Sequence, residues 1–491
     1  MILSQAWNEP RVSDSQIPPR EDLEHLLFAR GYLLSCTPRP APASHWRARQ
    51  VGSWHLLWDP RLTVSFAELD GRSIVVVGEA IDLLRMVTGP PVAANLLEAW
   101  EHSRERLDAA LELLAGRFVI LGQASEGDFF QTDAAALLSA FYSATHQVIS
   151  SHQNLVAETV GGLDLTELRG PLAGLGTRFV GVRMLTANTE LNLRDFSVAR
   201  IGPRPTDEAE PREVATEVLD LMRRQYRFLR RPGGGPLVSL TAGLDSRITL
   251  AAMREMVPET LFFTYEKRYN LADGSDCDMA TATELSDHLG LDHKGYTILA
   301  ADIPRRLKAL LRRNTELSHG RAVAASYLRE LPADRLHVRS NLYEVARGFY
   351  RKKERPQVGP ALFAQLISKN ADVAPAVVEA FEEMSAVTGI LDVPGYDPLD
   401  LFYWEFRMGS WFHKVLLESD IAHDTHILFN ARVILRLMLS VSARDRVQAT
   451  VFDHIVDLAW PAVYDLPING RRRRLPFAAE AHPVSGSQFP L

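Results

Sequence analysis

The feature that most constrains the fold is a short apolar run that stops at a group of small residues and gives way to a helix. The run covers residues 236–240, and Thr241, Ala242 and Gly243 follow it in the segment PLVSLTAGLDSRITLAAM. Small side chains at a strand-to-helix turn let the backbone approach an anion, and the first N–H groups of the helix point at that anion. The segment therefore predicts a phosphate site, although an ordinary connection between a strand and a helix has the same spacing.

Two common phosphate loops do not fit this segment. A Walker loop needs G-x-x-x-x-G-K-[ST] and a dinucleotide fold needs G-x-G-x-x-G, and the segment has neither pattern. Asp245 lies just past the turn. A carboxylate there predicts a ligand for Mg²⁺, which neutralises the phosphates that it faces.

Strand and helix patterns alternate around the turn. The expected helices cover residues 213–230, 247–256 and 279–289, and the expected strands cover 236–240, 261–265 and 293–299. Such alternation is typical of a mostly parallel sheet. From about residue 395 the pattern is mainly helical, so we expect an α/β domain with a helical C-terminal part.

The first 200 residues mix strands and helices without that alternation, which predicts a separate α+β domain. The strongest local signal is Asp70-Gly71 between β-rich runs at 62–69 and 74–77, because Asp-Gly favours a tight hairpin turn. An amphipathic helix is expected at 92–115, and strands are expected at 118–121, 148–150 and 183–193. The polar segment GPRPTDEAEPR reads as an exposed connection. We place the domain boundary there, giving domains 1–205 and 206–491.

Charge, cysteine content and the absence of long apolar runs indicate which partners and which cellular compartment to expect. The chain of 491 residues has 54 Lys and Arg against 61 Asp and Glu, a net charge of −7, which makes nucleic acid an unlikely main partner. Cys36 and Cys277 are the two cysteines and are far apart, so a disulfide framework is not expected. The N-terminus does not have the pattern of a signal peptide, and no run is long enough for a membrane span. We expect a cytoplasmic protein that does not enter the membrane.

The segment LTAGLDSR resembles the S-G-G-x-D-S pyrophosphate loop of the ATP pyrophosphatase superfamily, and specifically of asparagine synthetases and their relatives. Downstream, residues 262–265 and the segment SDCDMATATELSDHLGLDHK are similar to the family's second strand and following helix, with Asp278, Ala282 and His293 at its Glu, Ala and His positions. Cys277 stands where that motif has Asp. Upstream, residues 116–143 and 185–193 resemble strands of the family's glutaminase-like N-terminal domain.

This resemblance implies an ATP-dependent, AMP-forming amide ligase or cyclase with an N-terminal domain similar to nucleophile hydrolases. The implied cofactors are ATP and Mg²⁺. The implied partners are a small-molecule or peptide carboxylate and an amine, as in β-lactam synthetases or lasso-peptide cyclases of natural-product biosynthesis. The residues carried over for ATP and pyrophosphate are Leu240, Thr241, Ala242, Gly243, Asp245, Ser246, Thr264 and Tyr265, with Asp245 as the metal ligand.

Two departures from the family pattern concern catalysis. Glutamine-hydrolysing members use an N-terminal cysteine, whereas residue 2 is Ile2, so we expect no glutaminase activity and a retained N-terminal scaffold that offers a contact surface for a homodimer. The family's G-x-G-x-D-E segment is best matched by RSNLYEVARGFY. Tyr343 stands there in place of the Asp. Glu344 is the substitute metal ligand, or Tyr343 and Glu344 form a proton relay, or both are structural.

Some further residue groups have a structural and a functional interpretation. Lys414 is the last lysine, which leaves Arg471 to Arg474 as the cations that could replace a C-terminal lysine of relatives, although such a run is more often solvated. His423 and His426 have helical metal-ligand spacing, and we favour structural histidines. The remaining group is aromatic or polar: Trp404, Phe406, Trp411 and Phe412 are expected in the core, and Arg407 and Asp420 are candidates for lining a substrate pocket.

Two rival functions stay open at this point. A tRNA-modifying adenylating enzyme uses the same loop, but it predicts a basic face and functional cysteines. A non-catalytic scaffold or sensor is the other alternative, because the thiol and the second Asp of the family pattern are missing.

Overall fold

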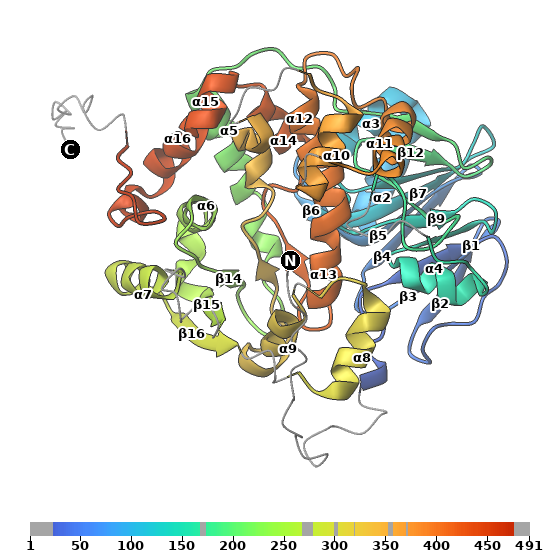
Figure 1. Ribbon diagram of the computed structural model, residues 1–491, viewed down its shortest axis with the longest axis horizontal. Coiled ribbons are helices and arrows are strands. Elements are labelled where there is room, and N and C mark those ends of the chain that lie inside the picture. Colours follow the sequence, from blue (N-terminus) through green and yellow to red (C-terminus); the bar gives the residue numbers. More distant parts are fainter. Residues whose placement is uncertain are drawn as a thin grey trace, which may run out of the picture.

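A computed structural model describes residues 23–166, 173–267, 278–298, 303–318, 320–351, 357–369 and 372–475. Figure 1 shows antiparallel strands on the right, a parallel sheet at the lower left and C-terminal helices along the top. Ile2 and Cys277, which the sequence singled out, lie outside the described residues.

The hairpin predicted at Asp70-Gly71 is confirmed. Strand β4 (Val64–Leu69) pairs antiparallel with β5 (Arg72–Asp82), with Leu69 opposite Arg72. Both turn residues have positive φ angles, 48° for Asp70 and 81° for Gly71. A two-residue turn of this kind matches the twist of the flanking strands, which explains why the short Asp-Gly signal was sufficient.

The part of the chain before residue 201 forms two antiparallel sheets in the described residues. The first has the order β11-β9-β10-β1-β3-β2 and the second has the order β13-β12-β8-β7-β5-β4, with β6 beside β5. The other strands of the first sheet are β1 (Tyr32–Ser35), β2 (Arg47–Val51), β3 (Trp54–Trp58), β9 (Phe141–Ser143), β10 (Val148–Ser150) and β11 (Arg183–Met184). Those of the second sheet are β6 (Val87–Thr88), β7 (Leu114–Gln123), β8 (Phe129–Thr132), β12 (Thr189–Asn192) and β13 (Val198–Arg200).

The two sheets are packed face to face and have helices on their outer faces. One buried cluster joins them, with Leu34 and Leu56 from the first sheet and Val75 and Leu121 from the second. Helices α2 (Pro90–His102) and α3 (Arg104–Glu112) cover the other face of the second sheet, and α4 (Gln153–Val160) packs on the first. The α+β expectation is confirmed as this layered arrangement.

Two of the expected elements in this region are wrong in extent. The helix expected at 92–115 breaks at Ser103, whose side chain accepts a hydrogen bond from the N–H of Arg106 and so caps a second helix. The strand expected at 183–193 divides into β11 and β12, because the segment between them turns at Asn188, which has a positive φ angle.

The parallel sheet that the alternation predicts is present, with the order β16-β15-β14-β17-β18. All its pairings are parallel. Its strands and the helices beside them are β14 (Leu237–Ser239), β15 (Leu261–Lys267), β16 (His293–Ile298), β17 (His337–Val338), β18 (Thr425–His426), α5 (Pro211–Arg223), α6 (Leu244–Ala252), α7 (Asp278–Leu289), α8 (Arg305–Asn314) and α9 (Arg321–Glu330).

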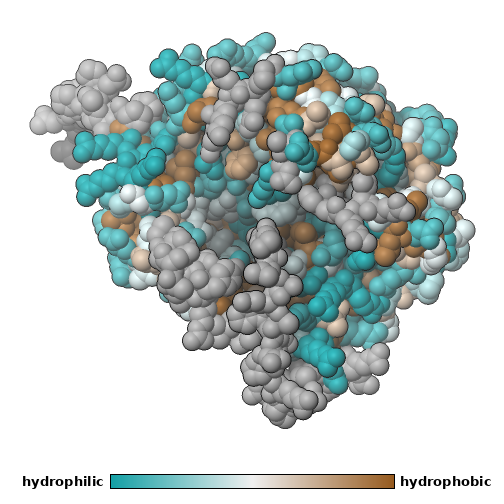
Figure 2. All heavy atoms as spheres, viewed as in Figure 1, coloured by the Kyte–Doolittle hydropathy of each residue, from teal (hydrophilic) through white to brown (hydrophobic). Residues whose placement is uncertain are grey.

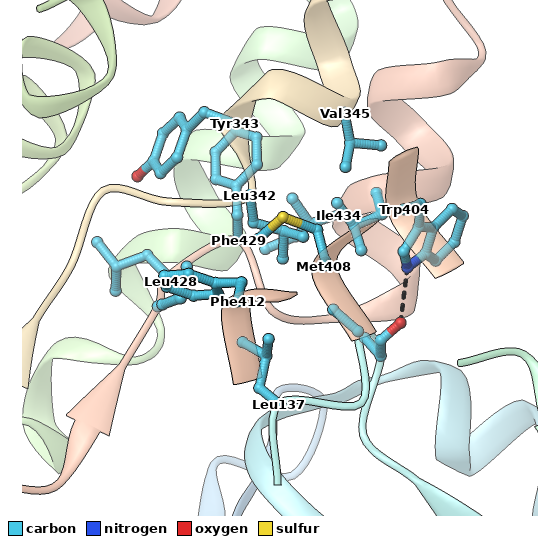
Figure 3. Close-up of a cluster of buried hydrophobic side chains, with 14 of the residues drawn as sticks. Leu137, Leu342, Tyr343, Val345, Trp404, Met408, Phe412, Leu428, Phe429 and Ile434 are labelled. Atoms are coloured by element: carbon cyan, nitrogen blue, oxygen red, sulfur yellow. Dashed lines mark hydrogen bonds between the residues drawn. The ribbon is translucent and has the colours of Figure 1, made fainter. Parts of the chain in front are cut away.

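The C-terminal part is mainly helical, as expected, and builds a large aromatic core. Its helices are α10 (Pro360–Ser368), α11 (Pro375–Thr388), α12 (Pro398–Leu401), the π-helix η8 (Phe402–Phe412), α13 (His413–Ser419), α14 (Arg432–Leu439), α15 (Ala443–Gln448) and α16 (Thr450–Ala459). Figure 3 shows side chains from this core, including Trp404, Met408 and Phe412 of η8. Trp404 and Phe406 are buried as expected, and the indole N–H of Trp404 donates to the backbone oxygen of Ala134 at 2.7 Å.

The N-terminal sheets and the C-terminal helices are joined by buried polar contacts. Arg117 of β7 forms a bidentate ion pair with Asp420, with N–O distances of 2.8 and 2.9 Å. Arg200 pairs with Glu405 at 2.8 Å. Asp420 therefore serves the contact between these regions and does not line a substrate pocket, which corrects that expectation.

Within the described ranges, none of the helices combines the length and apolar character that crossing a bilayer requires. Figure 2 shows one face of the molecule, on which hydrophilic residues cover much of the coloured surface and hydrophobic residues lie among them in small groups.

Candidate functional site

The candidate site lies at the carboxyl end of β14, where the chain turns into α6. Gly243 is the last residue before the helix, and no side chain caps the helix start. The N–H groups in the first turn of a helix have no acceptor within the helix, and the helix dipole adds positive potential there. Ligands of parallel sheets bind at the carboxyl ends of the strands, and this turn occupies such an end.

Hydrogen bonds within the loop give it a fixed shape. The hydroxyl of Ser246 lies 3.0 Å from the hydroxyl of Thr241 and donates toward the backbone oxygens of Thr241 and Gly243 at 3.1 Å. The N–H of Gly243 donates to the Thr241 hydroxyl at 3.2 Å. Ser246 is therefore directed back into the loop that the sequence assigned to phosphate.

A C-terminal segment, residues 463–469, supports the loop through hydrogen bonds. Arg247 is fully buried and donates to the backbone oxygens of Val463 at 2.6 Å and Pro467 at 3.0 Å. Burial lowers the pKa of Arg247 to about 10. The N–H of Asn469 also donates to the backbone oxygen of Ala242 at 2.9 Å. The LPING turn is thus part of the wall that holds the loop in place.

Both acidic residues at the loop contact a donor of the chain itself. Nη2 of Arg347 donates to Oδ2 of Asp245 at 2.7 Å. The backbone N–H of Ala242 donates to Oδ1 of Asp278, the first residue of α7, at 2.7 Å. A carboxylate on this N–H shows that the loop presents a donor to an oxyanion, as a phosphate cradle requires.

The neighbouring strand β15 closes one side of the site. The hydroxyl of Thr264 donates to the backbone oxygen of Leu240 at 2.7 Å and lies 2.9 Å from Nε2 of His293. Burial lowers the pKa of His293, so its imidazole favours the neutral form. Tyr265 lies one residue further along β15, with its ring centroid 6.2 Å from that of Tyr327. Thr264 and Tyr265 are thus next to the loop, and their place beside an adenine stays a prediction.

These residues surround a pocket of about 400 Å³. Its lining comprises Ser239, Leu240, Thr241, Gly243, Asp245, Ser246, Phe263, Thr264, Tyr265, Lys267, Asp278, Tyr327, Arg339, Ser340 and Asn341. Seven of the eight residues predicted for ATP and pyrophosphate line this pocket. The exception is Ala242, which is buried and faces the site with its backbone N–H.

Tyr343 and Glu344 are not brought into this lining. Tyr343 is fully buried, its ring stacks on Phe429 with a centroid distance of 4.0 Å, and its hydroxyl lies 2.8 Å from that of Thr249. Burial raises the pKa of the Tyr343 phenol and of the Glu344 carboxyl, and Arg347 partly opposes the shift at Glu344. This geometry gives Tyr343 a packing role, and a catalytic role for the pair stays a prediction.

The two histidines have structural partners, whereas three residues of the arginine run, Arg471, Arg472 and Arg474, are exposed. His423 and His426 do not share a helix: α13 ends at Ser419, and His426 lies in strand β18. Nε2 of His423 lies 2.8 Å from the backbone oxygen of Pro332. Nε2 of His426 lies 2.7 Å from the side-chain oxygen of Gln225. In the arginine run, Arg473 pairs with Asp453 at 2.6 Å.

Three cations near the loop were not predicted from the sequence. Arg347 pairs with Asp245, and Arg339 and Lys267 line the pocket. Arg339 directly follows β17, a strand of two residues that is too short to give a periodic pattern. The rule that ligands bind at the carboxyl ends of parallel strands would have found Arg339 once that strand was known.

The carboxylates at the loop fit a magnesium ion that is held mainly by phosphate. The described part of the chain has no group of three or more His, Cys, Asp or Glu residues arranged to hold a metal. Mg²⁺ is commonly bound by one or two carboxylates together with substrate phosphates. Asp245 and Asp278 both line the pocket and supply such a donor set.

No family model matches the chain, and no curated protein matches it. Among solved structures, NMN synthetase from Francisella tularensis is similar at 17% identity over 39% of this chain and 78% of that chain, with a TM-score of 0.19. Glutamine phosphoribosylpyrophosphate amidotransferase from B. subtilis, complexed with ADP and GMP, is similar at 11% identity over 75% and 85%, with a TM-score of 0.23. Glutamine-dependent NAD⁺ synthetase from Acinetobacter baumannii, in complex with ADP, is similar at 14% identity over 48% and 49%, with a TM-score of 0.21. TM-scores this low carry no argument, so the function rests on the site itself.

Proposed function

We propose that the protein is an ATP-dependent, AMP-forming amide ligase of the asparagine synthetase-like type. A substrate carboxylate attacks the α-phosphorus of ATP, which forms an acyl adenylate and releases pyrophosphate. An amine then attacks the acyl carbon, and AMP leaves with the electrons of the broken C–O bond. The amine loses a proton as the amide forms, and the amine belongs to the same molecule or to a second substrate.

The observation that carries the proposal is the loop between β14 and α6. It combines small residues, a helix start without a side-chain cap, and a backbone N–H of Ala242 that already holds a carboxylate oxygen at 2.7 Å. Backbone donors fixed in this way bind phosphate without reorganisation. In this assignment the loop and Ser246 bind the β- and γ-phosphates, which leave as pyrophosphate.

The acids and the β15 side complete the assignment. Asp245 and Asp278 would hold Mg²⁺, which supplies neutralisation of the phosphate charge. Asp245 must then exchange its contact with Arg347 or share it. Thr264 and Tyr265 would lie beside the adenine, since they are on the strand next to the loop and their side chains line the same pocket.

The N-terminal sheets would be a retained scaffold of a domain covering residues 1–205, with residues 206–491 as the synthetase domain. Glutaminase activity is predicted to be absent because Ile2 stands where the family has its cysteine. The layered pair of antiparallel sheets supports a domain similar to nucleophile hydrolases. The buried pair of Arg117 and Asp420 supports a fixed contact between the two domains.

Two internal contacts favour a second candidate, a scaffold or sensor without catalysis. Arg347 contacts the acid assigned to the metal, and Asp278 contacts a donor assigned to phosphate. If these internal contacts persisted in the presence of nucleotide, the chain would keep the fold and bind no substrate.

Isotope exchange between pyrophosphate and ATP separates the two candidates. The purified protein is incubated with ATP, Mg²⁺, labelled pyrophosphate and a panel of carboxylates, together with the Asp245→Asn variant and an Asp220→Asn control. Asp220 lies on α5 and pairs with Arg224 away from the pocket. Exchange that depends on a carboxylate, is lost in Asp245→Asn and persists in Asp220→Asn supports the ligase. Absence of exchange with every carboxylate, while the protein is folded, overturns it.

A further inference from the structure

Arg339 is a cation of the pocket wall that the nucleotide assignment does not use. It follows β17, and its backbone N–H donates to the backbone oxygen of His426 at 3.0 Å, which ties it to the adjacent strand β18. Its guanidinium carbon lies 5.4 Å from the ring centroid of Phe412. Phe412 is buried and belongs to the cluster of buried hydrophobic side chains drawn in Figure 3. The arginine is therefore positioned by contacts with strand β18 and with a buried ring.

The guanidinium of Arg339 is not matched by an acid. Within the ranges that the structure describes, no carboxylate lies within ion-pair distance of it. The two acids of the same pocket have other contacts, Asp245 with Arg347 and Asp278 with the N–H of Ala242, each at 2.7 Å. A cation held on an aromatic ring, in a pocket and without a counter-ion, favours binding an anionic ligand.

The strand order indicates which ligand reaches Arg339. In the order β15-β14-β17, the loop after β14 lies between Tyr265 on β15 and Arg339 after β17. If the loop holds the phosphates and β15 lies beside the adenine, Arg339 is on the opposite side of the phosphates. The acyl substrate has to approach from a side that the nucleotide leaves open.

Arg339 suits a spectator anion better than the reacting carboxylate. A guanidinium on the reacting carboxylate would withdraw charge from the nucleophile, and the interaction would weaken as the adenylate forms. Such an interaction is stronger in the ground state than in the transition state and slows the reaction. A second anionic group that does not react keeps its charge throughout, and the planar guanidinium fits a carboxylate with two parallel hydrogen bonds.

We propose that Arg339 binds a second, non-reacting carboxylate of the acyl substrate and so selects dicarboxylic substrates. This inference rests on the proposed adenylation, and it assigns the substrate class of that same pocket.

The test compares two substrates of equal length that differ in one charge, glutarate and glutaramate. In pyrophosphate exchange, glutarate is expected to exceed glutaramate in kcat/KM for the unaltered protein. Arg339→Met is expected to lower the glutarate-to-glutaramate ratio by about 10- to 100-fold, the range for hydrogen bonds to a charged group. Arg339→Lys keeps the positive charge but loses the planar guanidinium that makes two parallel hydrogen bonds. This variant should keep part of the preference for glutarate over glutaramate. Arg335→Met is the control, since Arg335 bonds to the backbone of Gly233 outside the pocket.

The outcomes separate this inference from the proposed function. Equal use of glutarate and glutaramate by the unaltered protein overturns it. A loss of ATP affinity in Arg339→Met with an unchanged ratio makes Arg339 a phosphate ligand and also overturns it.

If no carboxylate supports exchange, the ligase proposal fails and Arg339 is tested by calorimetry with glutarate in the presence of α,β-methylene-ATP. Binding of glutarate that disappears in Arg339→Met supports the site in that case. Equal binding by both proteins, or absence of binding to either, rejects it.

Discussion

Arg347 donates a hydrogen bond from Nη2 to Oδ2 of Asp245 at 2.7 Å, and this contact joins the segment after β17 to the first turn of α6. The pair is partly exposed, with 26% of the Arg347 side chain and 18% of the Asp245 side chain accessible. If Asp245 binds magnesium, Arg347 competes with the metal for the same carboxylate. The ion pair would then raise the Mg²⁺ concentration that is required for half-maximal ATP binding.

Replacing Arg347 with Met is expected to lower the Mg²⁺ concentration for half-maximal ATP binding by about two- to fivefold, because a partly exposed ion pair contributes up to about 1 kcal/mol. Asp245→Asn is expected to raise it. Titration of a fluorescent ATP analogue at a series of Mg²⁺ concentrations measures the effect. Arg212→Met, on the surface of α5, serves as the control. A higher Mg²⁺ requirement in Arg347→Met would show that Arg347 assists the phosphate and does not compete with the metal.

Gly243→Val should reduce the affinity for ATP and pyrophosphate by about tenfold or more, which corresponds to a loss of about 1.4 kcal/mol of binding free energy. A Cβ at Gly243 would lie 3.3 Å from the hydroxyl of Thr241, and the two methyl groups beyond it would occupy the turn where phosphate is expected. The φ angle of Gly243 is −79°, which other residues adopt without strain, so the fold should persist. Calorimetry with each ligand, beside circular dichroism, is the measurement. Unchanged affinity in the folded variant would place phosphate elsewhere.

Tyr343→Phe distinguishes packing from proton transfer. The phenol is buried and shares a hydrogen bond with Thr249, so its removal is expected to cost about 1 kcal/mol of unfolding free energy and to leave kcat within about twofold. Urea unfolding and the exchange rate report the two quantities. A loss of kcat by about 100-fold without a loss of stability would instead support the relay of Tyr343 and Glu344.

Arg247→Met is expected to lower the free energy of unfolding by about 2–3 kcal/mol. The change leaves the backbone oxygens of Val463 and Pro467 without their donor in a buried setting. Urea unfolding measures the loss. Arg247→Lys reaches fewer acceptors, so its free energy of unfolding should lie between those of the original protein and Arg247→Met. If Arg247→Met is as stable as the original protein, the LPING turn is held by other contacts.

Glu418 on α13 should make stability depend on pH. Burial raises its pKa from 4.5 to about 7 while the N–H of Gly320 donates to it. The folded protein therefore holds this proton more tightly than the unfolded chain, so the contribution is fully present below about pH 4.5 and is lost as pH rises through about 7. Glu418→Gln should remove the Glu418 contribution to this fall between about pH 5 and pH 8, measured by urea unfolding, while buried Glu79, whose pKa is also raised to about 7, keeps its own contribution. Exposed Glu68→Gln is the control and should keep it.

Local sequence signals predicted the elements whose causes are local. Asp70-Gly71 was sufficient for the hairpin, because those two residues adopt the positive φ angles of the turn. The alternation of strands and helices after residue 205 was sufficient to predict the parallel sheet. A helix between two strands carries the chain back to the start of the sheet, so the second strand runs parallel to the first. The helix at 92–115 was overextended, because the apolar period continues through Ser103 although Ser103 caps a new helix.

The sequence by itself determined the loop at Thr241, Ala242 and Gly243, since its small side chains and the helix that follows are neighbours in the chain. Only the tertiary structure decided what faces that loop. Arg339 and Arg347 are far from the loop in the sequence: Arg339 directly follows a strand of two residues, and Arg347 ends the 3-10 helix Tyr343–Arg347. Contacts between distant segments depend on packing of the whole core, and no local pattern encodes them. For the same reason Tyr343, a neighbour of those arginines in the sequence, points into the core instead of the pocket.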